Sequence, residues 1–219
     1  MEKVKFHFDV RCPWCYQTSR WINRLDELGV IEADWGVFSL EVVHAHDEGT
    51  DPETLEAISG PALRTAIAIR DSEGSRAIGP FYRALGKRIW EQPPPIPMLT
   101  AVRESLTEAG LDEALLDKAL SDPATWTAVV REHQDVVDAH HAFGVPTIVL
   151  DGGAGPAIFG PVIRELPDDE TSIELWQHVS WLARYENFSE IKRHRPAPPD
   201  LEVVRWRMEQ EAKNVAQAT

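Results

Sequence analysis

The chain has 219 residues, of which 43% are hydrophobic, enough for a large core and for one or two domains. Its net charge of −14 argues against nucleic acid and anionic membrane surfaces as partners, because both need clustered Lys and Arg. No segment approaches the roughly 18 consecutive apolar residues of a membrane-spanning helix, and no signal-peptide core follows Met1. We therefore expect a cytoplasmic protein without a membrane partner.

The first forty residues predict a strand, a helix and a second strand. Residues 3–9 alternate apolar and polar side chains, and residues 31–40 do so again, with a slip near Phe38. Between them, residues 13–28 carry apolar side chains at helical spacing, and Gly29 supplies a stop.

A long helical stretch follows, and it predicts an all-helical subdomain inserted over residues 46–142. Helical periodicity recurs between Gly and Pro breaks, and the last helix, after Asp122-Pro123, ends at Gly144. The expected helices cover residues 52–70, 74–90, 97–110 and 111–120 and the segment after Pro123, with a polyproline-like connection over residues 91–97.

Strand character returns at residues 147–150 and 157–159, and a final core helix is expected over residues 171–185. Residues 200–216 fit either a polar extra helix or a partly disordered tail. The sum is an α/β fold whose sheet is interrupted by helices. The predicted parts are a discontinuous sheet domain (residues 1–45 and 143–195), the inserted helical subdomain (46–142) and a C-terminal extension (196–219).

The two cysteines of the chain stand in the motif Cys12-Pro13-Trp14-Cys15, between the first strand and the first helix. Free N–H groups and the dipole at a helix start stabilise a thiolate, so Cys12 is the expected attacking sulfur. Cys15 lies about one helical turn further on and is expected to attack a mixed disulfide formed on Cys12. We predict a reversible dithiol–disulfide site.

A zinc site and a pair of inert thiols are the alternatives for this motif. Structural zinc needs four ligands, usually with a second pair at short spacing. Adjacent histidines on a helix, such as His140 and His141, point about 100° apart and cannot chelate one ion together. We therefore expect no metal.

The sequence Val145-Pro146-Thr147 is the second indication of a functional site. Pro146 opens a core strand although proline has no N–H to donate to a neighbouring strand, so its position needs a special reason. A cis Val145–Pro146 bond facing Cys12 would account for it, and would leave the backbone of Val145 free to pair with a thiol ligand. Asp9 is a candidate proton acceptor near the site, and a simple strand-end turn residue is the equal alternative.

The order of these features resembles the DsbA family of thioredoxin-fold proteins: strand, Cys-Pro-Trp-Cys, helix, helical insertion, Gly-Val-Pro-Thr, hairpin and helix. Further stretches resemble the actinobacterial mycothiol-dependent nitroreductase group over about residues 4–195. They are Phe8-Asp9, Thr18-Ser19-Arg20-Trp21, Phe38-Ser39-Leu40, Leu85-Gly86-Lys87-Arg88-Ile89, Phe159-Gly160-Pro161-Val162-Ile163 and Glu190-Ile191-Lys192-Arg193.

This resemblance implies a thioredoxin-like fold and a cytoplasmic, often dimeric reductase. It implies no tightly bound cofactor; mycothiol, or alternatively glutathione, would supply electrons through a mixed disulfide with Cys12. The electrophilic or disulfide substrate would be a small molecule. Candidate binding residues are Pro13, Trp14, Val145, Pro146, His44 and Trp90. Cations that are candidates for attracting an anionic thiol are Arg88, Lys192, Arg193 and Arg195.

Two positions depart from the family pattern. Where members can carry Asn in the loop after Phe-Ser-Leu, this chain has His44, and where they can carry His after Arg-Ile, it has Trp90. The resemblance therefore does not by itself extend nitroaromatic reduction to this chain. Two other functions stay open: a thiol-dependent isomerase or transferase of the same fold, of the 2-hydroxychromene-2-carboxylate isomerase or kappa glutathione transferase type, and a non-enzymatic binding module.

Overall fold

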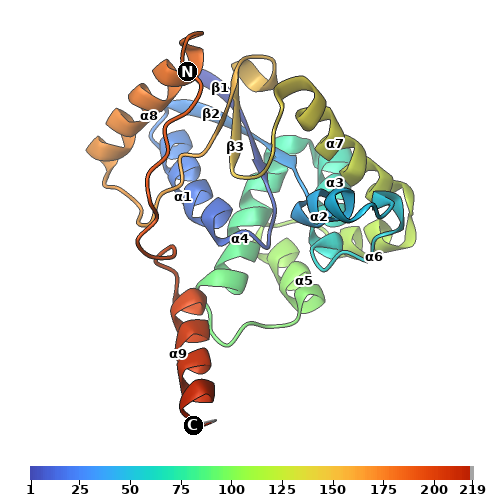
Figure 1. The fold of residues 1–219 in the computed structure, drawn as a ribbon. Coiled ribbons are helices and arrows are strands. Elements are labelled where there is room, and N and C mark those ends of the chain that lie inside the picture. Colours follow the sequence, from blue (N-terminus) through green and yellow to red (C-terminus); the bar gives the residue numbers. More distant parts are fainter. Residues whose placement is uncertain (218–219) are drawn as a thin grey trace.

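The computed structural model describes residues 1–217, in which a mixed sheet of four strands lies among helices (Figure 1). The strands are β1 (Glu2–Phe8), β2 (Ile31–Val37), β3 (Thr147–Leu150) and β4 (Ala157–Phe159). They lie in the order β2-β1-β3-β4, with β1 and β2 parallel and the other two neighbouring pairs antiparallel. Because β1 and β2 are parallel, the segment that follows the buried strand β1 starts at the end of the sheet where β2 also ends.

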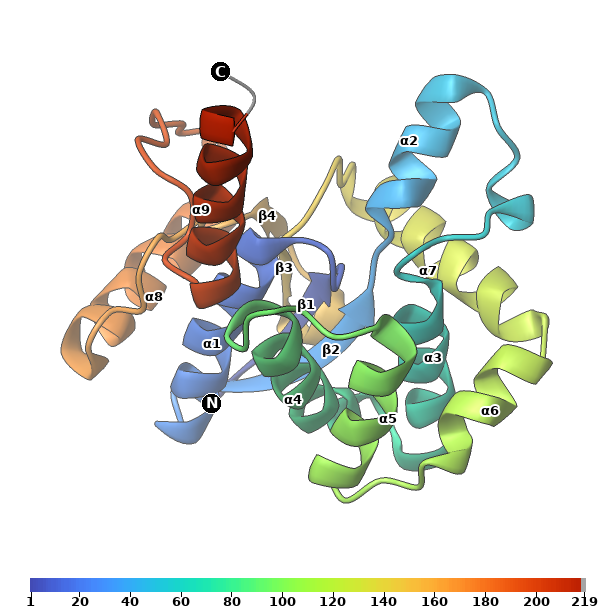
Figure 2. The same cartoon turned by 90° about the horizontal axis from the view of Figure 1, so that it is seen from below.

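The helices α2 to α7 all lie between β2 and β3 in the chain, as the predicted insertion requires. Figures 1 and 2 show α1 and α8 on one side of the sheet and α2, α3, α5, α6 and α7 gathered on the other. The helices are α1 (Pro13–Glu27), α2 (Leu40–Glu48), α3 (Gly60–Glu73), α4 (Ile78–Trp90), α5 (Met98–Glu108), α6 (Ala114–Ser121), α7 (Ala124–His140), α8 (Asp169–Arg184) and α9 (Glu202–Gln217).

Sheet and inserted helices share a hydrophobic core. Phe6 and Phe8 of β1 are fully buried in the same cluster as Leu63 of α3 and Phe81 of α4. Burial of such large side chains contributes about 1.5–3 kcal/mol each, so each part covers apolar side chains of the other. The domain boundaries at residues 45, 143 and 195 stay a prediction.

Helix α2 corrects the expected second strand, which does not continue to Leu40. Strand β2 ends at Val37, and Ser39 caps a helix by accepting the N–H of Val42 at 3.2 Å. Gly49 ends α2 in the left-handed conformation, with φ of 71°, which glycine adopts without steric cost. The alternation of apolar side chains past Val37 gave the wrong period because the cap at Ser39 overrides it.

The C-terminal segment forms the helix α9, one of the two outcomes expected for residues 200–216. Leu201, just before α9, is fully buried in a small cluster with Tyr16 and Trp90. From this anchor, α9 extends away from the sheet toward its C-terminal end (Figure 1). Within residues 1–217, no helix combines the length and the apolar character needed to cross a membrane.

Candidate active site

Cys12 lies at the N-terminus of α1, in the turn that follows β1. The N–H of Cys12 donates to the carbonyl of Asp9 at 3.1 Å, which closes the turn, and Pro13 starts the helix with a suitable φ. The Cys12 sulfur is the N-cap acceptor and receives the N–H of Cys15 at 3.3 Å. The Cys12 residue is 7% exposed and Cys15 is 0% exposed, so Cys12 is the more accessible of the two cysteines.

The two cysteines differ in acidity. The thiol of Cys15 donates to the Cys12 sulfur and lowers the pKa of Cys12, and the N–H groups of Cys15 and Trp14 act in the same direction against the cost of burial. Burial raises the pKa of the Cys15 thiol well above its ordinary value, and its bond to Cys12 adds to the rise. These directions favour a thiolate on Cys12 and a protonated thiol on Cys15, the arrangement that a dithiol exchange site needs.

The segment Val145–Pro146 faces the Cys12 sulfur, and its peptide bond is cis. In the thiol form, the Cys12 sulfur donates to the carbonyl oxygen of Val145 at 3.7 Å. The carbonyl that was expected to be free for a ligand is thus in contact with the cysteine itself. Thr147 follows as the first residue of β3 and pairs with His7 of β1, so the sheet fixes this segment beside the motif.

Asp9 lies buried behind the motif, with 0% exposure. Its two carboxyl oxygens accept the N–H of Arg11 at 2.8 Å and the N–H of Leu40 at 2.7 Å. The carboxyl group thereby ties the turn before Cys12 to the start of α2, which favours the turn role over that of a proton acceptor. Burial raises the pKa of Asp9 to about 6, against a smaller opposing effect of these N–H donors.

Removing the charge of Asp9 is expected to lower the pKa of Cys12. Above pH 6 the carboxylate is ionised, and its negative charge raises the pKa of both cysteines. The change Asp9→Asn therefore shifts the thiolate titration of Cys12, followed by ultraviolet thiolate absorbance, toward lower pH. Asp34→Asn, a carboxylate on β2, is the control and leaves the titration in place. A shift of Cys12 to higher pH in Asp9→Asn contradicts this account.

Trp14 of the motif and Trp90 of α4 each lie under an arginine of the C-terminal segment. The guanidinium of Arg195 lies 5.4 Å from the ring centroid of Trp14, and that of Arg207 lies 5.4 Å from the ring centroid of Trp90. The indole N–H of Trp90 donates to the carbonyl of Val10 at 3.2 Å, which fixes the ring two residues before Cys12. Trp90 is buried and is both a core residue and a cavity wall.

That cavity has a volume of about 300 Å³ and opens beside Val10 and Arg11. Trp90, Ile96 and Met98 form its apolar walls, and Arg207 lies at its edge. The volume is in the range of small-molecule sites. The cavity is therefore a candidate binding site, and it is lined by Val10 and Arg11, the two residues that precede Cys12.

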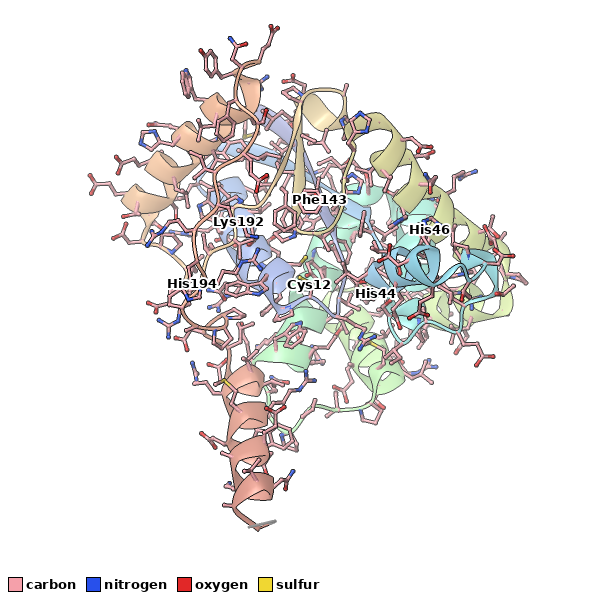
Figure 3. All side chains as sticks on the ribbon, viewed as in Figure 1. Cys12, His44, His46, Phe143, Lys192 and His194 are labelled. Atoms are coloured by element: carbon pink, nitrogen blue, oxygen red, sulfur yellow. The ribbon has the colours of Figure 1, made fainter. Side chains whose placement is uncertain are left out.

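His44 lies on α2, and this corrects the expectation that it belongs to a loop. Its side chain is exposed on the helix. Figure 3 shows His44 and Lys192 on opposite sides of Cys12. His44 therefore does not wall the cavity beside Trp90, and the structure does not bring these two departures from the family pattern together there.

Tyr82 is a residue of the site that the sequence did not single out. Its ring stacks on Phe8 with centroids 3.9 Å apart, and its hydroxyl is buried without a hydrogen-bond partner among residues 1–217. Burial raises the pKa of Tyr82, and the charges of Cys15 and Cys12 act in the same direction. The signal was present as the buried face of α4, where Tyr82 follows Phe81, but that pattern indicates packing rather than a site.

The fold defines the class of the molecule: it is a DsbA-like thioredoxin fold with a helical insertion. It matches the crystal structure of the probable DsbA oxidoreductase SCO1869 from Streptomyces coelicolor with a TM-score of 0.55 at 17% identity, over 92% of this chain and 98% of that chain. It also matches the cytosolic disulfide reductase DsbM from Pseudomonas aeruginosa with GSH, with a TM-score of 0.54 at 15% identity, over 82% and 99%.

The family model described as Rv2466c-like, mycothiol-dependent nitroreductase Rv2466c, matches residues 11–193. The chain is also 32% identical over 204 residues to the uncharacterized protein Rv2286c of Mycobacterium tuberculosis (strain ATCC 25618 / H37Rv), covering 93% of this chain and 86% of that protein. The chain belongs to the Rv2466c-like family, which makes it a thiol-dependent enzyme of the DsbA-like oxidoreductase type. The resemblance found in the sequence is confirmed. Among residues 1–217, no group of three or more His, Cys, Asp and Glu side chains is arranged to hold a metal ion.

Proposed function

We propose that the chain is a cytoplasmic thiol–disulfide oxidoreductase in which Cys12 and Cys15 carry the electrons. A low-molecular-weight thiol reduces the disulfide of these two cysteines, and mycothiol is the thiol that we propose. The observation that carries the proposal is geometric: the Cys12 sulfur caps the N-terminus of α1 and accepts the N–H of Cys15, whose own side chain is fully buried. The pKa directions agree with this geometry, since the pKa of Cys12 is lowered and that of Cys15 is raised. The description of the family as mycothiol-dependent supports mycothiol, and the glutathione in the DsbM structure supports glutathione as the alternative.

In the reductive direction the Cys12 thiolate attacks one sulfur of a disulfide substrate, and the other sulfur leaves as a thiolate. Cys15 loses its proton, attacks the Cys12 sulfur and releases the second thiol, which leaves a Cys12–Cys15 disulfide. One mycothiol thiolate then attacks the Cys12 sulfur of that disulfide, and Cys15 leaves and is protonated. A second mycothiol thiolate attacks the mycothiol sulfur of this mixed disulfide, which forms mycothiol disulfide and releases Cys12 as a thiolate. The substrate gains two electrons and two mycothiol molecules lose them.

Pro13, Trp14, Val145 and Pro146 are the residues that we propose to contact the thiol in the mixed disulfide. The contact of the Cys12 sulfur with the carbonyl of Val145 at 3.7 Å supports this. A thiol bonded to Cys12 would lie along the same backbone. A homodimer stays a prediction, which sedimentation of the full chain checks.

The recycling thiol is identified by mass spectrometry of the Cys15→Ser variant after incubation with mycothiol disulfide or glutathione disulfide. We expect one mycothiol adduct, mapped to Cys12, because the hydroxyl that replaces the Cys15 thiol cannot displace it. An equal or larger glutathione adduct moves the proposal to glutathione. No adduct with either disulfide contradicts the proposed recycling.

The second cysteine distinguishes the proposed redox function from an isomerase or transferase function of the same fold. Such chemistry holds a thiol for attack on an unsaturated substrate and has no step for Cys15. Full turnover in a Cys15→Ala variant would favour that reading, whereas the proposed cycle stops at the mixed disulfide. The buried contact between Cys15 and Cys12 supports the redox reading.

A further inference from the structure

The C-terminal segment, residues 192–207, carries cations that lack carboxylate partners. Arginines elsewhere are mostly paired; Arg88, a candidate for attracting an anionic thiol, binds Glu104 and Glu108 and is thereby neutralised. Among residues 1–217, Lys192, Arg195 and Arg207 form no ion pair. In a chain of net charge −14, free cations on one segment are a local exception.

One of these cations contacts the motif, and a second contacts the tryptophan that is hydrogen-bonded just before it. Arg195 lies over Trp14, which belongs to the motif itself, and Arg207 lies over Trp90, which is bonded to Val10. An arginine over an aromatic face is positioned by the ring but keeps its charge and its donors. In the view of Figure 3, Lys192 and His194 of the same segment lie on the side of Cys12 opposite to His44.

The cavity of about 300 Å³ adds an apolar compartment to this charge. Its walls Trp90, Ile96 and Met98 suit a flat apolar group, and Arg207 at its edge suits an anion. A cavity of roughly 150 Å³ holds benzene, so this one has room for a substituted ring. Arg11 at the rim is paired with Glu41 at 3.1 Å and contributes less.

We propose that the molecule attacked by Cys12 is an aromatic or similarly flat apolar compound carrying a carboxylate or another compact anion, which Arg195 and Arg207 recognise. This rests on the proposed function of Cys12 as the attacking sulfur. The segment 192–207 acts as a positively charged rim that draws such an anion to the site against the overall negative charge of the protein. The ring enters the cavity beside Trp90 and the anion faces Arg207, which lines that cavity, while Arg195 over Trp14 adds positive charge next to Cys12.

The first test compares two aromatic disulfides in single-turnover reactions with the reduced protein. Dithiobis(nitrobenzoate) carries two carboxylates, and dithiodipyridine is uncharged. The Cys12 thiolate attacks one sulfur, an aryl thiolate leaves, and Cys15 expels the second. We expect the ratio of the two rate constants, anionic over neutral, to fall about fivefold in Arg195→Gln/Arg207→Gln, because charged rims raise encounter rates by roughly 10-fold or more. Added salt lowers the ratio in the unsubstituted protein.

The matched control is Arg131→Gln, since Arg131 is exposed on α7 and forms no ion pair among residues 1–217. We expect its ratio to equal that of the unsubstituted protein. An unchanged ratio in the double variant overturns the proposal, because the arginines then do not distinguish the anionic from the neutral disulfide. If both rate constants also fall equally, the arginines act on Cys12 and not on the anion.

A binding titration separates failure of this inference from failure of the proposed function. Benzoate and its neutral isostere benzamide need no reaction at Cys12. We expect benzoate to bind at least about fivefold more tightly, an advantage that the double variant loses. If that preference is found but neither disulfide reacts at Cys12, the proposed function fails and the anion site stands. If the protein binds benzoate no more tightly than benzamide, the proposed anion site is wrong, whether or not Cys12 reacts.

Discussion

Cys12→Ser is expected to lower turnover of a disulfide substrate by roughly 10³-fold or more, because a serine hydroxyl is not ionised near neutral pH and cannot form a disulfide. The fold should survive, since serine is a good N-cap and its oxygen can accept the N–H of residue 15 as the Cys12 sulfur does. The measurement is the steady-state rate with mycothiol as reductant, with a thermal melt as the check on folding.

Cys15→Ser is the matched variant, one helical turn from the first. Here the attack by Cys12 still occurs, so in a reaction without mycothiol we expect a burst of one equivalent of released thiol and then no further release. Retention of full turnover by Cys12→Ser contradicts the assignment of the attacking sulfur. A burst from Cys12→Ser, with none from Cys15→Ser, reverses the two roles.

Gly86→Ala is expected to destabilise the protein by about 3 kcal/mol, at the upper end of overpacking effects. A methyl group at Gly86 on α4 would stand 2.1 Å and 2.2 Å from two ring carbons of Tyr16, which directly follows Cys15. Tyr16 is 2% exposed, and its hydroxyl donates to Glu91 at 2.7 Å, so its ring has little room to move. The free energy of unfolding is measured by urea denaturation.

Gly60→Ala is the control for that experiment, because Gly60 is also helical and its added methyl would meet only Ala57, at 3.7 Å. We expect this change to be neutral, or to stabilise by about 0.5 kcal/mol through lower backbone entropy in the unfolded chain. Equal effects of the two substitutions contradict the close contact with Tyr16. A cycle of Gly86→Ala with Tyr16→Leu should be non-additive.

The Cys12–Cys15 motif was visible in the sequence because its geometry is local. A strand, two cysteines three residues apart and Pro13 at the helix start define the helix N-terminus without any long-range contact. Strand β3 and helix α8 were predicted nearly in place for the same reason, since each has a clear period and a break at both ends.

The surroundings of the motif depend on contacts between distant segments and could not be read locally. Tyr82 lies behind the cysteines only because α4 packs under β1, and Asp9 reaches the N–H of Leu40 only because α2 starts there. The expected strand past Val37 hides the start of α2, and for that reason the sequence predicts a loop position for His44. The stacking of Arg195 on Trp14 joins segments about 180 residues apart, beyond any periodicity argument.

The difference in acidity between the two cysteines is tested most directly by measuring the alkylation rate of each sulfur against pH, with the labelled peptides separated by mass spectrometry. We expect the Cys12 peptide to be labelled with a midpoint below that of a free cysteine, and the Cys15 peptide to stay unlabelled across the same range. Labelling of Cys12 with the midpoint of a free cysteine, or labelling of Cys15 first, would contradict the account.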